Sequence, residues 1–272
     1  MSNLTHGSTD IVKTLKGTRK TGTTICGIVF DGGVVLAGDT RATADHMVMD
    51  KSIFKLHYLT PTIYCGGAGT ATDNEHVAQL ISSQLRLLEL NMRRPSRVET
   101  AVVQIKRHLF PYQGHLGVYF VLGGCDYTGA HLYCIAAHGS VDKVNFAVEG
   151  SGSYAAMGVI ESKYHEGMTE EEAVELAKEA ITAGIINDEG SGFFVDYVVI
   201  RKIPEPPYGI TEQHHHCLKP SPRQEKIPGL MTVKKGETEI MKEIVFDFAT
   251  HHETVTINKP FNDKIEPVGD LQ

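Results

Sequence analysis

The apolar positions of this chain recur at two spacings, one typical of strands and one typical of helices. Short runs rich in β-branched and apolar residues predict strands at Thr24–Phe30, Val34–Gly38, Thr62–Cys65, Val118–Gly123, Leu132–Ala137, Asn145–Val148 and Val195–Arg201. Asp31-Gly32-Gly33 separates the first two runs, and Asp-Gly favours the positive φ values of a tight turn. We therefore expect these two strands to pair as a hairpin.

Helical spacing predicts a first pair of helices in the middle of the chain. One apolar stripe runs from Val77 to Leu88 and ends before Pro95. A second stripe runs from Val98 to Leu109 and follows Ser96-Arg97-Val98-Glu99, which has the spacing of a capping box. We expect Ser96 and Glu99 to satisfy free backbone N–H groups at the start of the second helix.

A second pair of helices follows the later strands. Ser153–Tyr164 predicts one helix, and Thr169-Glu170-Glu171-Glu172 is a capping box before an apolar stripe that ends at Gly184. Because the helices come in pairs and do not alternate singly with strands, a doubly wound parallel sheet is disfavoured. We expect an α+β fold, a four-layer αββα sandwich of two antiparallel sheets with helices on both outer sides.

Both ends of the chain differ from this central part. Residues 1–22 are polar and become basic, with no apolar core for a secretory signal; a mitochondrial transit peptide, a tail and a removable pro-segment remain open. Six prolines interrupt the stretch between residues 204 and 228, and the strand-like runs Glu243–Phe248 and Thr254–Ile257 stand apart. We expect residues 23–203 to form one domain and residues 204–272 an extended arm that lies on a partner chain.

Composition narrows the class of protein. The 272 residues carry 26 Lys and Arg against 33 Asp and Glu, a net charge of −7, so no overall basic field favours nucleic acid. No apolar run approaches the roughly 18 residues of a membrane span. The five cysteines lack metal-ligand spacing, and an odd number leaves one unpaired in any disulfide scheme. Reduced thiols in a cytosolic or nuclear setting are expected.

Four short motifs imitate functional sites. His214-His215-His216 could bind a metal, but it lies in the proline-bounded arm and is expected to be a solvated loop. Gly66-Gly67-Ala68-Gly69 lacks the following Lys-Ser/Thr of a phosphate loop, and Gly150-Ser151-Gly152-Ser153 lacks the spacing of a nucleophile elbow. The acidic run at Glu170–Glu172 suits a helix N-terminus. We therefore expect no metal site.

Thr23, Asp39 and Lys55 stand out chemically. Each would be unremarkable alone, since threonine often begins a strand, aspartate often lies in a turn and lysine is usually exposed. The sequence motifs that contain them, however, resemble those of the catalytic β-subunits of the 20S proteasome, which are N-terminal nucleophile hydrolases. The resemblance covers the chain from Gly22 onward and rests on motifs in family order: Gly22-Thr23, Asp39-Thr40-Arg41, Lys55, Gly67-Ala68-Gly69, Gly150-Ser151-Gly152-Ser153 and Asp188-Glu189-Gly190-Ser191-Gly192. Within the family the chain is most similar to the β2, or trypsin-like, type.

The resemblance implies that Thr23 becomes a nucleophile when the Gly22–Thr23 bond is cut by the chain itself. A threonine hydroxyl needs a base, and the freed α-amine, with an ordinary pKa of roughly 7.7–8.0, supplies one. Lys55 would lower the pKa of the amine and of the hydroxyl, and Asp39 would hold Lys55 charged. By resemblance, Ser151, Asp188 and Ser191 complete the network, and the Gly69 N–H is the oxyanion donor. Residues 1–22 would then be a propeptide that keeps the site latent.

The resemblance also implies a specificity pocket lined by Ala42, Ile53, Gly67 and Glu75. Gly67 leaves room for a long side chain, and the Glu75 carboxylate favours cleavage after Lys or Arg. Asp73 could add negative potential, although a helix N-cap is the favoured interpretation. His57 is expected to be a polar wall.

In the family such chains work in a 28-subunit core of α and β subunits. The resemblance therefore implies partner subunits, unfolded polypeptide substrates, regulatory caps bound through the α rings, ubiquitin-dependent degradation, and a location in cytoplasm and nucleus. It implies no cofactor, no nucleic acid and no membrane. Two alternatives stay open: a catalytically silent ring subunit, which would lack the Gly-Thr junction or Lys55, and a small-molecule amidase of the same superfamily, which would lack the arm and the Gly67/Glu75 combination.

Overall fold

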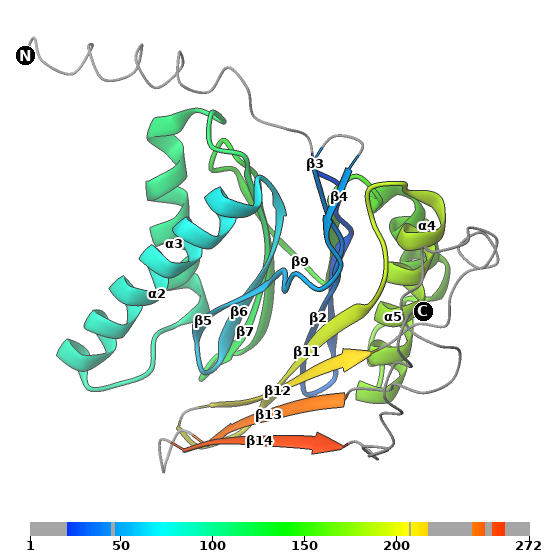
Figure 1. Cartoon of the computed structure of the whole chain (residues 1–272). Coiled ribbons are helices and arrows are strands. Elements are labelled where there is room, and N and C mark those ends of the chain that lie inside the picture. Colours follow the sequence, from blue (N-terminus) through cyan, green and yellow to red (C-terminus); the bar gives the residue numbers. More distant parts are fainter. Residues whose placement is uncertain (1–20, 45–46, 207, 217–240, 248–251, 259–272) are drawn as a thin grey trace, which may run out of the picture.

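The computed structural model describes residues 21–44, 47–206, 208–216, 241–247 and 252–258. Two antiparallel sheets face each other, and a pair of helices covers the outer side of each (Figure 1). The expected α+β sandwich is confirmed.

The first sheet contains strands from both halves of the chain. Its order is β10-β1-β2-β11-β12-β13-β14, and every neighbouring pair is antiparallel. The strand bounds are β1 Ile25–Phe30, β2 Gly33–Asp39, β10 Phe146–Glu149, β11 Val195–Lys202, β12 Gly209–His216, β13 Met241–Asp247 and β14 His252–Asn258. Phe30 pairs with Gly33, and Gly32 has a φ of 113°, so the predicted Asp-Gly hairpin is confirmed.

The second sheet has the order β5-β6-β7-β8-β9, again antiparallel throughout. Its strands are β5 Leu56–Thr60, β6 Ile63–Gly69, β7 Val118–Asp126, β8 Gly129–Ile135 and β9 Val141–Val144. A separate short hairpin pairs β3 (Ala42–Ala44) with β4 (Met47–Asp50). The pattern of apolar residues did not predict β3, β4, β5, β9 or β12.

Helices α2 (Ala71–Met92) and α3 (Val98–Leu109) cover the second sheet, and α4 (Ser153–Lys163) and α5 (Glu170–Asn187) cover the first (Figure 1). A 3-10 turn at Phe110–Tyr112 follows α3. Three buried apolar clusters fill the spaces between the layers. Ile181 belongs to the cluster under α5, Ile81 to the cluster under α2, and Leu36 to the cluster between the two sheets.

One of the two predicted capping boxes is confirmed and the other is wrong. At α5, the Thr169 hydroxyl accepts from the Glu172 N–H while the Glu172 carboxylate accepts from the Thr169 N–H. At α3, neither predicted cap forms. Glu99 pairs with Arg97, and the buried Ser96 hydroxyl has no hydrogen-bond partner in the described part of the chain.

The cap of α3 comes from another element. The Val98 N–H donates to Asp126 Oδ2 at 3.1 Å, and Asp126 is the last residue of β7. A carboxylate near a helix N-terminus satisfies the free N–H groups as a serine would and adds a favourable interaction with the helix dipole. The predicted box fails because this carboxylate, brought close by the sheet, already fills the position.

The predicted arm begins as part of the first sheet. β12 pairs with β11 along its whole length, from Gly209 opposite Lys202 to His216 opposite Val195. The triple histidine therefore lies in a strand, and the expected solvated loop is wrong; the His214 ring stacks on Tyr197. β13 and β14, which match the two separate strand-like runs, continue the same sheet. Residues 217–240 and 259–272 of the arm lie outside the described residues.

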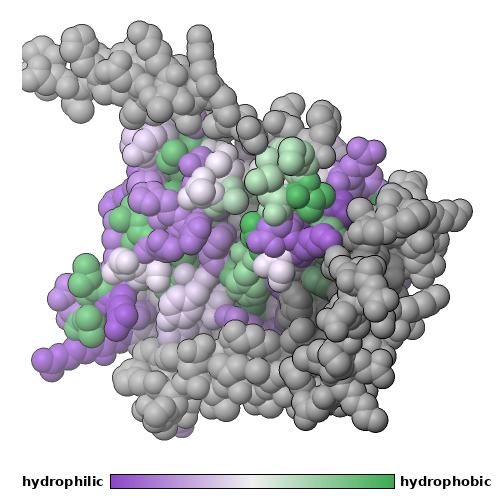
Figure 2. Space-filling view, in the orientation of Figure 1, coloured by the Kyte–Doolittle hydropathy of each residue, from purple (hydrophilic) through white to green (hydrophobic). Residues whose placement is uncertain are grey.

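Several large apolar side chains are exposed on the surface. Met47 and Met49 of β4 are 67% and 64% exposed, and Leu87 and Leu90 near the end of α2 are similarly open. Apolar atoms gather on the face drawn in Figure 2 near the position of the β3–β4 hairpin in Figure 1. Exposed apolar groups of this kind suit contacts with other chains. None of the described helices is long and apolar enough to span a membrane.

Candidate active site

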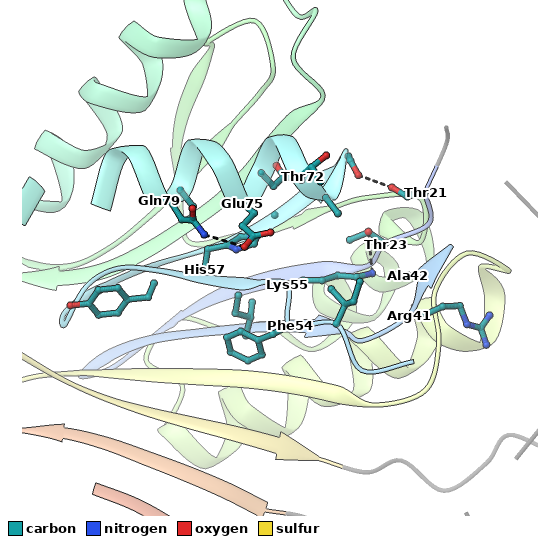
Figure 3. A pocket seen from close by; sticks show the side chains of 18 of the residues that line it. Thr21, Thr23, Arg41, Ala42, Phe54, Lys55, His57, Thr72, Glu75 and Gln79 are labelled. Carbon is teal, nitrogen blue, oxygen red and sulfur yellow. Dashed lines mark hydrogen bonds between the residues drawn. The ribbon is translucent and has the colours of Figure 1, made fainter. Parts of the chain in front are cut away.

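Thr23, Asp39 and Lys55 meet at the end of the sandwich where β1 begins and β2 ends. Thr23 precedes β1, Asp39 ends β2 and Lys55 precedes β5. Lys55 Nζ lies 3.1 Å from Thr23 Oγ1 and 2.7 Å from Asp39 Oδ1, and all three residues are at least 93% buried. Figure 3 shows Lys55 extending along the site toward Thr23. The fold thus joins a hydroxyl, an amine and a carboxylate in one hydrogen-bonded chain.

Burial and charge act on Lys55 in opposite directions. Removal from water lowers the pKa of Lys55, and the adjacent Asp39 carboxylate opposes that shift. The net direction is downward, so the Lys55 amine gives up its proton more readily than a surface lysine. The expectation that Asp39 simply holds Lys55 charged therefore describes only the smaller of the two effects.

Backbone N–H groups fix the Asp39 carboxylate. Oδ1 accepts from the Thr24 N–H at 2.9 Å, and Oδ2 accepts from the N–H groups of Arg41 and Gly192 at 3.1 and 3.0 Å. Charge-assisted bonds from backbone donors orient a carboxylate strongly. Asp39 can therefore hold Lys55 at Thr23.

A second hydrogen-bonded group approaches Thr23 from the opposite side. The Thr23 N–H donates to Ser151 Oγ at 3.0 Å, and the Ser151 hydroxyl donates to Asp188 Oδ2 at 2.6 Å. Ser191 donates to the same carboxylate oxygen at 2.7 Å. Ser151 lies just before α4 and contacts the N atom of Thr23, and Asp188, the C-cap of α5, holds Ser151 there.

The two residues before Thr23 are also anchored in the site. The Gly22 N–H donates to Thr43 Oγ1 at 2.9 Å, and the Thr21 hydroxyl donates to the Gly69 carbonyl at 2.6 Å. The Gly22 carbonyl oxygen accepts from Thr23 Oγ1 at 2.7 Å and from Lys55 Nζ at 3.2 Å. A Cβ on Gly22 would lie 2.0 Å from Gly190 Cα, so the position next to the predicted cleavage bond has no room for a side chain.

Gly69, whose N–H the resemblance assigns as the oxyanion donor, lines a pocket that also includes Thr23. Its φ is 101°, and a Cβ there would lie 2.2 Å from the Gly117 carbonyl oxygen. The backbone at this corner therefore requires glycine. Its role as an oxyanion donor stays a prediction.

A pocket of about 920 Å³ opens beside Thr23. Its lining includes every residue assigned to the specificity pocket: Ala42, Ile53, Gly67 and Glu75. A Cβ on Gly67 would lie 3.0 Å from His57 Nε2 and 3.1 Å from Asn74, so glycine keeps this part of the pocket open. Figure 3 shows Glu75 and Gln79 on α2 facing His57 on β5.

The charged and polar groups of the pocket interact with one another. Burial lowers the pKa of His57, and the Glu75 carboxylate opposes this. Gln79 donates to Glu75 Oε1 at 3.1 Å, a contact that the sequence analysis missed although the four-residue spacing on a helix predicts it. Asp73 is not the N-cap of α2, which is Thr70; it lies in the first turn and accepts from the Gly117 N–H at 3.1 Å.

Comparison with known proteins gives a consistent family. Residues 19–200 match a family model described as proteasome subunit. The chain belongs to the proteasome subunit family. It is 52% identical over 204 residues to proteasome subunit beta type-7-B of Arabidopsis thaliana, which covers 75% of this chain and 72% of that protein.

Two fungal relatives cover more of this β subunit. It is 47% identical over 231 residues to probable proteasome subunit beta type-2 of Schizosaccharomyces pombe, covering 85% of this chain and 84% of the relative. It is 46% identical over 225 residues to proteasome subunit beta type-2 of Saccharomyces cerevisiae, covering 83% and 84%. The chain is thus a proteasome core subunit of the β type, and it assembles with other proteasome subunits.

Proposed function

We propose that this β subunit is a threonine endopeptidase that cleaves polypeptides after basic residues, with Thr23 as its nucleophile. The observation that carries the proposal is the position of Thr23 between two hydrogen-bonded groups, Lys55 with Asp39 at its hydroxyl and Ser151 with Asp188 at its nitrogen. A nucleophile, a base and groups that orient the base are the parts that acyl transfer requires.

The first reaction is removal of residues 1–22. Thr23 Oγ attacks the Gly22 carbonyl carbon, and because the Thr23 nitrogen is still an amide, the Oγ proton passes to the amine of a neutral Lys55. Lys55 then delivers that proton to the Thr23 nitrogen as the C–N bond breaks, which leaves an ester between Gly22 and Thr23 Oγ. Water hydrolyses the ester, releasing the Gly22 carboxylate and restoring the Thr23 hydroxyl beside a free α-amine. The lowered pKa of Lys55 supports its role as proton carrier.

The second reaction uses the amine that the first one exposes. The neutral α-amine takes the Oγ proton as Oγ attacks the substrate carbonyl carbon, and it returns that proton to the leaving amine. Ser151 accepts an N–H of the α-amine, which directs the lone pair toward Oγ. Water then hydrolyses the acyl ester and frees the new carboxyl terminus. No cofactor is needed for either reaction.

The pocket supports a preference for Lys or Arg before the cleaved bond. Gly67 leaves the pocket deep, and Glu75 offers a carboxylate to a cationic head group. A charge pair at about 4 Å gains about 4 kcal/mol at an effective dielectric of about 20, before desolvation. Because Glu75 is solvent-exposed in the free chain, screening reduces the net gain.

The particle in which the subunit works, its substrates and its cellular location are part of the same proposal. We propose that the subunit works in a 28-subunit core of α and β subunits, that regulatory caps bind through the α rings, and that unfolded polypeptides reach Thr23 in ubiquitin-dependent degradation. We place it in the cytoplasm and nucleus. The exposed Met47, Met49, Leu87 and Leu90 support subunit contacts, since burial in the particle would remove them from water.

The N-terminal residue of the assembled subunit tests the proposal. The parent chain is expected to begin at Thr23, to cleave a fluorogenic peptide after arginine, and to be labelled at Thr23 by a peptide epoxyketone. Thr23→Ala is expected to keep residues 1–22 and to lose cleavage after arginine, whereas Thr21→Ser should behave as the parent. A parent subunit that retains residues 1–22 in a particle that cleaves at this subunit would rule out the proposal, and a parent without cleavage would indicate a silent ring subunit.

A further inference from the structure

Thr24 connects the two hydrogen-bonded groups that meet at Thr23. It is fully buried, and its N–H donates to Asp39 Oδ1 at 2.9 Å, the oxygen that also holds Lys55. Its hydroxyl lies 2.7 Å from Ser191 Oγ, on the other side of the site. One residue therefore contacts the Lys55 group through its backbone and the Asp188 group through its side chain.

The direction of the hydroxyl protons follows from counting donors. Ser191 has one hydroxyl proton, which it donates to Asp188 Oδ2. The bond between Thr24 and Ser191 must then use the Thr24 proton, with Ser191 Oγ as the acceptor. The result is an ordered chain in which Thr24 donates to Ser191 and Ser191 donates to the carboxylate that also anchors Ser151.

The surrounding backbone is shaped around the Thr24 side chain. A Cβ on Gly152, the N-cap of α4, would lie 2.0 Å from Thr24 Oγ1. A Cβ on Gly184 of α5 would lie 2.5 Å from both Thr24 Oγ1 and Thr24 Cγ2. The backbone of both helices thus packs directly on Thr24, which sets the distance between the helix ends that carry Ser151 and Asp188 and the strand that carries Thr23.

We propose that Thr24 is a positioning residue for the catalytic amine, acting through its hydroxyl on Ser191, Asp188 and Ser151. This inference rests on the proposed function, because the amine exists only after Thr23 is freed. Without the Thr24 hydroxyl, the buried Ser191 loses its donor and is free to turn away from Asp188. The Asp188 carboxylate then accepts one hydrogen bond fewer, so it stabilises the protonated α-amine more strongly and raises the pKa of that amine. A smaller fraction of the amine is then neutral, and able to accept the Oγ proton, at neutral pH.

Thr24→Val, Thr24→Ala and Thr24→Ser in the assembled particle test the proposal. Thr24→Val keeps the branched shape and removes the hydroxyl, so kcat for a peptide with arginine before the cleaved bond is expected to fall about tenfold, the size of effect of one buried hydrogen bond. KM should change little, and the acid limb of the kcat/KM profile should move to higher pH. Thr24→Ser should restore both, since it keeps the hydroxyl. The matched control is Thr182→Val on α5, whose hydroxyl donates to the Lys178 carbonyl within the helix.

Three results would overturn the inference: Thr24→Val with the kcat and pH profile of the parent, Thr24→Ser as impaired as Thr24→Val, or Thr182→Val with the same defect. If Thr24→Val fails to assemble, Thr24→Ala removes the same hydroxyl without adding bulk and is judged by the same criteria. Absence of Thr23-dependent cleavage in the parent would instead contradict the proposed function. The two failures are therefore distinguishable.

Discussion

Lys55 shows how burial changes the proton affinity of a single amine. Its Nζ contacts the Thr23 hydroxyl, the Gly22 carbonyl oxygen and the Asp39 carboxylate, so it lies beside the atoms that react in the proposed cleavage of the Gly22–Thr23 bond. The same residue on the surface would be solvated and fully protonated. Burial lowers its pKa, and Asp39 limits the shift, which leaves an amine that can both accept and return a proton.

At the same scale, Glu75 is expected to set the preference for basic residues. Glu75→Gln keeps the shape and the hydrogen-bonding capacity of the side chain but removes its charge. The value of kcat/KM for peptides with arginine before the cleaved bond should fall about two- to fivefold, because the net worth of a screened charge pair is about 0.5–1 kcal/mol. Peptides with leucine there should be unaffected, and Glu171→Gln on the exposed start of α5 is the control. An unchanged ratio of arginine to leucine cleavage would remove Glu75 from this role.

His57 leads to an expected pH dependence of the same preference. Burial lowers the pKa of His57, so the ring is neutral at pH 7 and remains so below the ordinary value of about 6.5. Protonation would add a cation beside Glu75 and repel a basic substrate side chain. The ratio of arginine to leucine cleavage should therefore stay constant from pH 8 to pH 6.5 and decline only in more acidic buffer. His57→Asn should remove that decline, because the variant side chain cannot gain a proton in this range; a decline in the parent already above pH 6.5 would contradict the expected sign.

Secondary-structure elements in this chain are completed by groups far away in the sequence. α3 begins at Val98, yet its first N–H is satisfied by Asp126 at the end of β7. The same carboxylate accepts from Thr128 and lies 3.4 Å from His131, so it holds the turn between β7 and β8 as well. The helix and the turn are therefore stabilised by one side chain.

The stability of α3 should accordingly depend on Asp126 and not on Ser96. Asp126→Ala is expected to speed hydrogen exchange of the first α3 amides about fivefold, which corresponds to the roughly 1 kcal/mol typical of a helix cap. Ser96→Ala should leave exchange unchanged, because its hydroxyl has no partner among the described residues. Hydrogen exchange with mass spectrometry on the assembled particle measures both variants. A larger effect of Ser96→Ala would favour the capping box indicated by the sequence.

For the whole molecule, the four layers decide where the site lies. β1 and β2 bring Thr23 and Asp39 from the first sheet, β5 brings Lys55 from the second, and the ends of α4 and α5 bring Ser151 and Asp188. The β3–β4 hairpin projects at the same end of the sandwich, with Thr43 holding Gly22 and Met47 exposed. A face of this kind places the pocket beside a surface that suits a neighbouring subunit.

The arm gives a prediction at the same scale. A chain that ends after His216 keeps β1 to β12 but lacks residues 217–272, the greater part of the predicted arm. We expect it to remain folded, as judged by resistance to proteolysis, because all members of the three buried clusters whose side chains the structure describes lie within the retained residues. Co-expressed with its partner subunits, it should be largely missing from assembled particles on native gels. Incorporation equal to that of the full chain would show that the arm is not needed for assembly.

Apart from the Ser96–Glu99 capping box, which is wrong, sequence reasoning succeeded where the determinant is local or forms part of a family motif. The Asp31-Gly32 turn, the Thr169–Glu172 capping box and the helical stripes depend on residues within four positions of each other, and all are confirmed. It failed for short strands such as β5 and β9, which have too few residues for a recognisable alternation and form because a neighbouring strand offers free backbone groups.

The sequence by itself determined the family, the types of most elements and the residues that the structure gathers around Thr23. Only the tertiary structure decided how those residues are held: Thr23 meets Ser151 across 128 positions, and Thr24 meets Ser191 across 167. It also decided that Asp126 caps α3 and that β12 extends the first sheet. The physical reason is that turn and helix preferences act between near neighbours, whereas contacts between distant residues depend on how the sheets and helices pack.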